Sequence, residues 1–180
     1  LEDGARLEWL PQESLAYPGC DALNQLTIHL APSAECMAWD VTALGLDAAQ
    51  APFSSGRYVQ HMEMPGVWLE RGVIDALDQR LMTSPLGLAG QRCMASLLFA
   101  AGSPLTPQRV QAALESAQAC LDDSPLKLTA GVTLAAPQVL VLRALAPMTE
   151  PAVLLLRRVW AAWRETLWGL PGQASRLWSL

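Results

Sequence analysis

The sequence is poor in the side chains that most enzymes use for catalysis or metal binding. Its 180 residues include only two histidines, His29 and His61, and four cysteines. It contains no Cys-x-x-Cys pair and no Gly-x-Ser-x-Gly turn, so neither a zinc or redox motif nor a serine-hydrolase elbow is expected. Glycine motifs that bind phosphates or dinucleotides are missing as well. We interpret the cysteines as reduced thiols among apolar neighbours, at positions Cys20, Cys36, Cys93 and Cys120.

The chain also has few charges and no long uncharged stretch. Charged residues make up 16% of it and the formal net charge is −5, which argues against a general nucleic-acid-binding protein. The most apolar run, residues 153–170, contains four charged residues, so it is not predicted to span a membrane. The length of 180 residues predicts one domain, or most of one, over residues 1–180, and an apolar content of 52% predicts a sizeable core.

Alternation of apolar and polar residues predicts strands through the first hundred residues. It is clear in residues 26–30, 37–42 and 67–70, and residues 93–100 form a further predicted strand. Turns rich in Pro, Gly and Ser separate these segments at short intervals. Many short strands of this kind are typical of a sandwich, a barrel or a solenoid. Residues 72–91 are less regular, with one or two helical turns expected near their start.

The last eighty residues predict two helices and a hairpin. Thr106 is a good N-cap, and Pro107 suits the first position of the helix that follows it. A second helix is predicted over residues 150–168, with its charged side chains gathered on one face. Between the helices, residues 127–134 and 138–145 predict paired strands.

Acidic residues on the strand-like segments are the remaining candidates for chemistry. In a sheet each would point away from its apolar neighbours. They could face solvent, or they could line a polar interior channel in which carboxylates escort a cation. These residues are Glu8, Glu13, Asp40, Glu63 and Glu70.

Several short motifs follow one another along the chain. The first is LEWLPQE at residues 7–13. The later motifs are Leu30-Ala31-Pro32, Trp39-Asp40, Leu44-Gly45, residues 53–57, Leu69-Glu70-Arg71, residues 84–90, residues 157–163 and Arg176-Leu177-Trp178. In this order they resemble one known family, the UreD (also UreH) urease accessory proteins, whose central signature is similar to LEWLPQE, and the resemblance covers essentially the whole chain.

The resemblance implies a cytoplasmic protein that is not an enzyme. Family members act as scaffolds or chaperones in urease maturation, bind the urease apoprotein and UreF, and through UreF join the GTPase UreG. No tightly bound cofactor is expected, and nickel would be bound only transiently on its way to urease. The implied fold is mainly β with a few α-helices: stacked antiparallel strands in a β-helix-like arrangement, with two clear helices in the C-terminal half. Family members carry a further segment before LEWLPQE, so we expect the chain to lack the N-terminal third.

The resemblance also suggests sites. An internal nickel tunnel would draw its lining from Glu13, Asp40 and Glu70. The C-terminal helix is a candidate contact for partners, through large apolar side chains. These side chains are Leu154, Trp160, Trp163 and Trp168. For Trp160 and Trp163, burial in the core is the simpler explanation.

Two alternatives stay open at this point. A metal-free structural subunit of a β-rich assembly would have the same sequence pattern as a nickel conduit. A hydrolase with an unfamiliar site built on Ser84 and His61 would rest on residue types alone.

Overall fold

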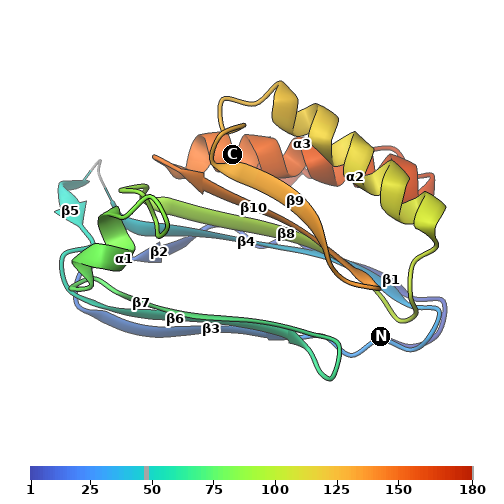
Figure 1. Cartoon of the computed structure of the whole chain (residues 1–180), viewed down its shortest axis with the longest axis horizontal. Helices are drawn as coiled ribbons and strands as arrows, with labels where there is room; N and C mark the ends of the chain where they lie inside the picture. Colours follow the sequence, from blue (N-terminus) through green and yellow to red (C-terminus); the bar gives the residue numbers. More distant parts are fainter. Residues whose placement is uncertain (47–48, 180) are drawn as a thin grey trace.

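The protein consists of two stacked β-sheets with two long helices on the outer face of the larger one (Figure 1). The computed structural model describes residues 1–46 and 49–179. The strands are β1 (Arg6–Trp9), β2 (Ser14–Ala16), β3 (Cys20–Thr27), β4 (Glu35–Leu46), β5 (Ala51–Pro52), β6 (Gly56–Met64), β7 (Trp68–Asp75), β8 (Cys93–Ala101), β9 (Ala130–Ala136) and β10 (Val139–Ala146). The helices are α1 (Gln79–Thr83), α2 (Pro107–Asp122), α3 (Thr149–Trp168) and the 3-10 turn η2 (Arg176–Ser179).

The larger sheet has the order β1-β4-β8-β10-β9, and β2 and β5 also pair with β4. The smaller sheet has the order β3-β6-β7. The prediction of a mainly β fold with helices in its C-terminal half is confirmed. The pairing is mixed, however, because β1 and β2 run parallel to β4, and β3 runs parallel to β6. The chain crosses from one sheet to the other and back, and successive crossings bring strands of the same direction side by side.

Most of the expected elements form close to their predicted positions. The N-cap of α2 is Thr106, whose hydroxyl accepts a hydrogen bond from the backbone N–H of Arg109 at 3.3 Å. Helix α3 ends at Trp168 and is capped by Gly169 in the left-handed conformation, which glycine adopts without a steric penalty. The irregular segment after residue 72 divides into the end of β7 and the short helix α1. No helix within residues 1–46 and 49–179 is both long enough and apolar enough to cross a membrane.

Side chains alternate across the larger sheet and so build two separate cores. On β4, Met37, Trp39 and Val41 point toward the helices, where they belong to the same apolar cluster as the fully buried Trp163. The alternate residues of β4, such as Cys36 and Ala38, point toward the smaller sheet. This second core is made of two apolar clusters. The Met62 cluster contains Ile28, Cys36, Ala38, Met62, Met64, Trp68, Leu98, Ala100, Val139 and Val141. The Tyr58 cluster contains Ala16, Leu44, Phe53, Tyr58, Ile74, Ala76 and Leu88.

Candidate functional site

Polar side chains lie between the two apolar clusters, in the space between the sheets. They come from strands of both sheets and occupy the same level of the sandwich. We call this group the polar layer: Asn24 on β3, Asp40 and Thr42 on β4, Gln60 on β6, Glu70 on β7, Ser96 on β8 and Arg143 on β10.

Strand register explains why these residues meet. In the larger sheet Ser96 is the partner of both Asp40 on β4 and Arg143 on β10. In the smaller sheet Asn24 is paired with Gln60. Glu70 is paired with Met62, which lies two residues beyond Gln60 on β6 and on the same face. Since paired residues on neighbouring strands point to the same face, the polar positions form a row across each sheet, and the two rows face each other.

Asp40 is the centre of the polar layer. Its side chain is buried, with the residue 8% exposed. One carboxylate oxygen accepts a hydrogen bond from Asn24 Nδ2 at 2.7 Å. The other accepts from Thr42 Oγ1 at 3.0 Å and from Gln60 Nε2 at 3.1 Å. Burial raises the pKa of the Asp40 carboxyl above its usual value and the nearby charge of Glu70 adds to this, while hydrogen bonds from Thr42 and Asn24 act in the opposite direction.

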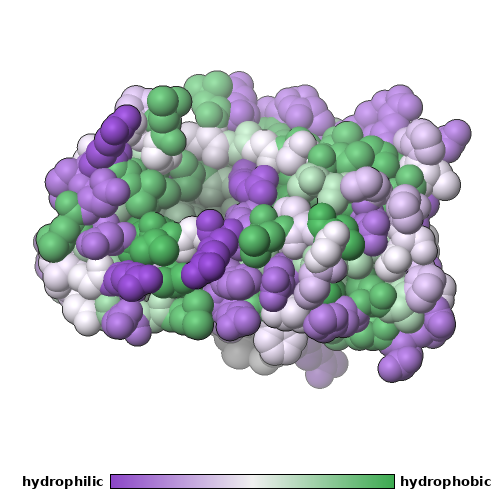
Figure 2. Space-filling model, turned by 60° about the horizontal axis from the view of Figure 1, so that its bottom comes forward, coloured by the Kyte–Doolittle hydropathy of each residue, from purple (hydrophilic) through white to green (hydrophobic). Residues whose placement is uncertain are grey.

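A cavity of about 540 Å³ opens beside Asp40. Gln60, Glu70, Ser96 and Arg143 also line it, and the hairpin of β9 and β10 borders it. The space is large enough for several water molecules. In Figure 2 the surface is hollowed left of the centre, with hydrophilic side chains on its rim.

An ion pair joins the two sheets at this cavity. Arg143 Nε donates to Glu70 Oε2 at 2.9 Å, and a second guanidinium nitrogen donates to the same oxygen. The Arg143 side chain is 47% exposed and that of Glu70 is 22% exposed. Exposure therefore falls from Arg143, through Glu70, to the buried carboxylate of Asp40.

The structure brings together two of the three residues predicted for a nickel path. Asp40 and Glu70 line the same cavity. Glu13 lies apart from them, because it is exposed and borders a small recess with Trp39 and Val41, which point to the helix side of the larger sheet. Among residues 1–46 and 49–179, no group of three or more His, Cys, Asp or Glu side chains is placed to hold a metal ion.

Of the four residues predicted to contact partners through α3, one is exposed and three are buried. Leu154 is 53% exposed and accessible to another protein. The tryptophans are buried and bonded within the chain, so the structure gives them an internal role. Trp163 Nε1 donates to the carbonyl of Ala113 at 3.0 Å. Trp160 Nε1 donates to Glu8 at 2.8 Å, and Trp168 Nε1 donates to Glu35 at 2.6 Å.

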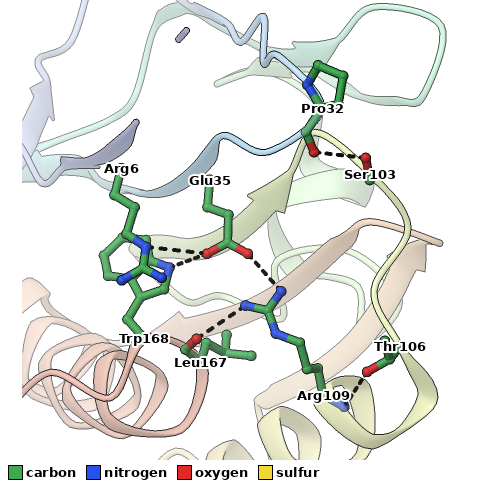
Figure 3. Close-up of polar contacts among 8 residues, drawn as sticks. All are labelled: Arg6, Pro32, Glu35, Ser103, Thr106, Arg109, Leu167 and Trp168. Atoms are coloured by element: carbon green, nitrogen blue, oxygen red, sulfur yellow. Dashed lines mark hydrogen bonds and ion pairs between the residues drawn. The ribbon is translucent and has the colours of Figure 1, made fainter. Parts of the chain in front are cut away.

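Glu35 attaches the helices to the larger sheet, a role that the sequence did not reveal. Figure 3 shows its carboxylate at the start of β4, facing both Arg109 of α2 and Trp168 of α3. Arg109 Nη1 donates to Glu35 Oε1 at 2.7 Å, and Arg6 Nε lies 3.7 Å from Oε2. Glu8, the first carboxylate of LEWLPQE, similarly accepts from Arg164 Nη1 at 2.7 Å. These partners are far away along the chain, and no local pattern indicates them.

The residues of the hydrolase alternative do not form a catalytic pair. The hydroxyl of Ser84 accepts a hydrogen bond from the backbone N–H of Leu86 at 3.2 Å, within a turn. His61 Nε2 lies 3.5 Å from Glu63 Oε2 on the outer face of the smaller sheet. Within the part of the chain that the structure describes, no hydrogen bond joins Ser84 to His61.

Comparison with known proteins agrees with the motif order. The family model described as "UreD urease accessory protein" matches residues 1–179. The chain belongs to the UreD family. It is 57% identical over 180 residues to the urease accessory protein UreD of Paracidovorax citrulli, with 100% of this chain and 65% of that protein covered. The UreD proteins of Verminephrobacter eiseniae and Albidiferax ferrireducens are 59% and 56% identical with the same coverage. The chain spans about 65% of the length of these curated relatives.

The structure shows what the residues of the opening motif, LEWLPQE, contact in this member of the UreD family. Strand β1 ends at Trp9, before Pro11, and the carbonyl of Pro11 accepts a hydrogen bond from Trp39 Nε1 at 2.8 Å. Glu8 contacts α3, whereas Glu13 is exposed. The two carboxylates of LEWLPQE therefore have different environments, and the first one supports the fold.

Proposed function

We propose that this protein is a non-catalytic scaffold in urease maturation, and that nickel ions pass through its polar layer on their way to the urease apoprotein. It would bind the apoprotein together with UreF and, through UreF, the GTPase UreG, in the cytoplasm. The match to the UreD family over residues 1–179 supports the link to urease. The observation that carries the nickel path is the cavity between the sheets, in which Asp40 and Glu70 are the acidic lining residues.

The chemistry of the polar layer suits a passing cation. Nickel is a borderline metal ion that accepts carboxylate, amide and hydroxyl oxygens, but it binds tightly only where several good ligands converge. Two carboxylates, one of them paired with Arg143, offer a weak and reversible site. Such a site favours transfer over storage.

Helix α3 offers partners fewer exposed side chains than the four that the sequence suggested. Because Trp160, Trp163 and Trp168 are part of the core, a partner that docks on α3 would contact its exposed side, where Leu154 is the large apolar residue. The buried core of an interface is more apolar than its rim, so an exposed apolar side chain suits such a contact. We therefore assign Leu154 alone, from the four candidates, to a contact with UreF or urease.

The path can be tested in full-length protein with the double substitution Asp40→Asn and Glu70→Gln. These changes remove both negative charges and keep the size of the side chains. We expect urease activation in cells to fall at least tenfold while urease and UreF still co-purify with the variant. A matched control is Glu13→Gln, which removes an exposed carboxylate outside the cavity and should leave activation unchanged.

The result also separates the proposal from a metal-free scaffold. Normal activation by the double variant would exclude the polar layer as the nickel path and would favour a purely structural role. Failure of the unmodified full-length protein to co-purify with either urease or UreF would contradict the scaffold role itself.

A further inference from the structure

We propose that Arg143 is an electrostatic gate at the mouth of the cavity, which opposes the entry of divalent cations while it is paired with Glu70. This inference rests on the proposed function, because it assigns a regulatory residue to the same path. It concerns how readily a cation reaches Asp40, and not which proteins the scaffold binds.

The position of Arg143 supports this role. It lies on β10 of the larger sheet, and its guanidinium reaches across to Glu70 on β7 of the smaller sheet. Among the described residues that line the cavity, Arg143 is the only cationic side chain. It is also more exposed than Glu70 or Asp40. A cation approaching from solvent would therefore meet a positive charge before it met either carboxylate.

Charge balance gives the gate its effect. With Arg143 in place, its positive charge offsets that of Glu70, and Glu70 Oε2 is occupied by two guanidinium N–H groups. A divalent cation is repelled by Arg143 and must compete with it for this oxygen. Once Arg143 moves away, Glu70 and Asp40 present two carboxylates to the same cavity.

Opening the gate requires little rearrangement. The Arg143 side chain is already 47% exposed, so its guanidinium can exchange the two hydrogen bonds to Glu70 for hydrogen bonds to water. Exposed ion pairs contribute little to folding stability and are weakened by salt. Arg143 can therefore alternate between the paired and the open position while both sheets stay in place.

The test is equilibrium binding of Ni²⁺ to purified, tag-free full-length protein, with and without the substitution Arg143→Gln. Glutamine keeps a hydrogen-bond donor near Glu70 and removes the positive charge. We expect Ni²⁺ to bind about tenfold more tightly to this variant. This is the effect of deleting one positive charge that lies several ångströms from a divalent cation in a water-like medium. The difference should shrink at high salt, since an exposed charge is screened.

Two further variants show whether charge is responsible. Arg143→Lys keeps the charge and loses the forked geometry, so its affinity should stay close to that of the unmodified protein. Arg158→Gln is a matched control, because Arg158 is also 47% exposed and paired with a carboxylate, Asp123, at 3.4 Å, but lies on α3 away from the cavity. It should not change Ni²⁺ affinity. Urea midpoints measured alongside should agree among all these proteins.

The outcomes distinguish the gate from the path. Weaker Ni²⁺ binding by Asp40→Asn, with unchanged binding by Arg143→Gln, would overturn the gate and keep the path. Equal Ni²⁺ binding by the unmodified protein, Asp40→Asn and Arg143→Gln would overturn both. Tighter binding by Arg143→Gln that persists at high salt, or that Arg143→Lys reproduces, would also contradict an electrostatic gate.

Discussion

Replacing Glu35 by alanine should loosen the attachment of both long helices to the larger sheet. Glu35 begins β4, the strand that carries Asp40, and its two carboxylate oxygens bind different helices. Alanine removes both acceptors and leaves the indole N–H of the buried Trp168 without its partner. The guanidinium of Arg109 keeps its contact with the carbonyl of Leu167 at 3.2 Å.

The expected loss is about 3 kcal/mol. The buried bond from Trp168 contributes about 2 kcal/mol, because it involves a charged acceptor and leaves an unsatisfied donor when it is lost. Arg109 is 35% exposed, so its ion pair contributes only about 1 kcal/mol. Glu35→Gln keeps one acceptor oxygen and should cost about half as much.

Urea unfolding of the full-length protein measures this effect. With a slope of about 2 kcal/mol per molar urea, the midpoint should fall by about 1.5 M. Glu115→Ala is the control. This exposed carboxylate accepts a hydrogen bond from Gln111 on its own helix at 2.8 Å, and its loss should cost less than about 0.5 kcal/mol. A Glu35→Ala midpoint within the scatter of this control would refute the assignment of Glu35 as an anchor.

Three further predictions concern the core and the polar layer. Trp163→Ala should cost about 3–5 kcal/mol in urea unfolding, as for other buried aromatic residues, whereas Leu154→Ser at an exposed site should change stability by less than about 0.5 kcal/mol. Burial raises the pKa of Cys36 to about 11 and of Cys93 to about 12, so both thiols should resist alkylation in the native protein and react after unfolding; fast native labelling would contradict this. Because burial raises the folded-state pKa of Asp40, its charged form lowers stability at neutral pH. Asp40→Asn should therefore be more stable than the unmodified protein at pH 7, with the gain shrinking as pH falls below the folded-state pKa toward the ordinary value of 3.8, and a constant gain across that range would contradict it.

Local patterns were sufficient to predict most of the secondary structure. Alternation located β4 and β7, and Thr106 with Pro107 located the start of α2, because these signals depend on neighbouring residues. The parallel pairings were not predicted. They arise from the path of the chain between the two sheets, which depends on contacts between residues far apart in the sequence.

The candidate site was predictable only in part, for the same reason. Alternation indicates that Asp40 and Glu70 point away from their apolar neighbours, but it cannot say which sheet face becomes interior. It therefore could not separate these two carboxylates from Glu13. The partners of Glu8 and Glu35 were invisible, because a salt bridge between distant segments has no local sequence signal.

The polar layer also helps to fix the register in which the two sheets stack. A shift of β6 by one residue would turn Gln60 outward, and a shift by two would bring the apolar Met62 toward the carboxylate of Asp40. Either error removes the hydrogen bond from Gln60, one of the three donors to the buried carboxylate of Asp40, which is costly. Asp40 and its neighbours therefore penalise misaligned sheets during folding, so the same residues that could pass a cation also help to select the one stacking in which the cavity exists.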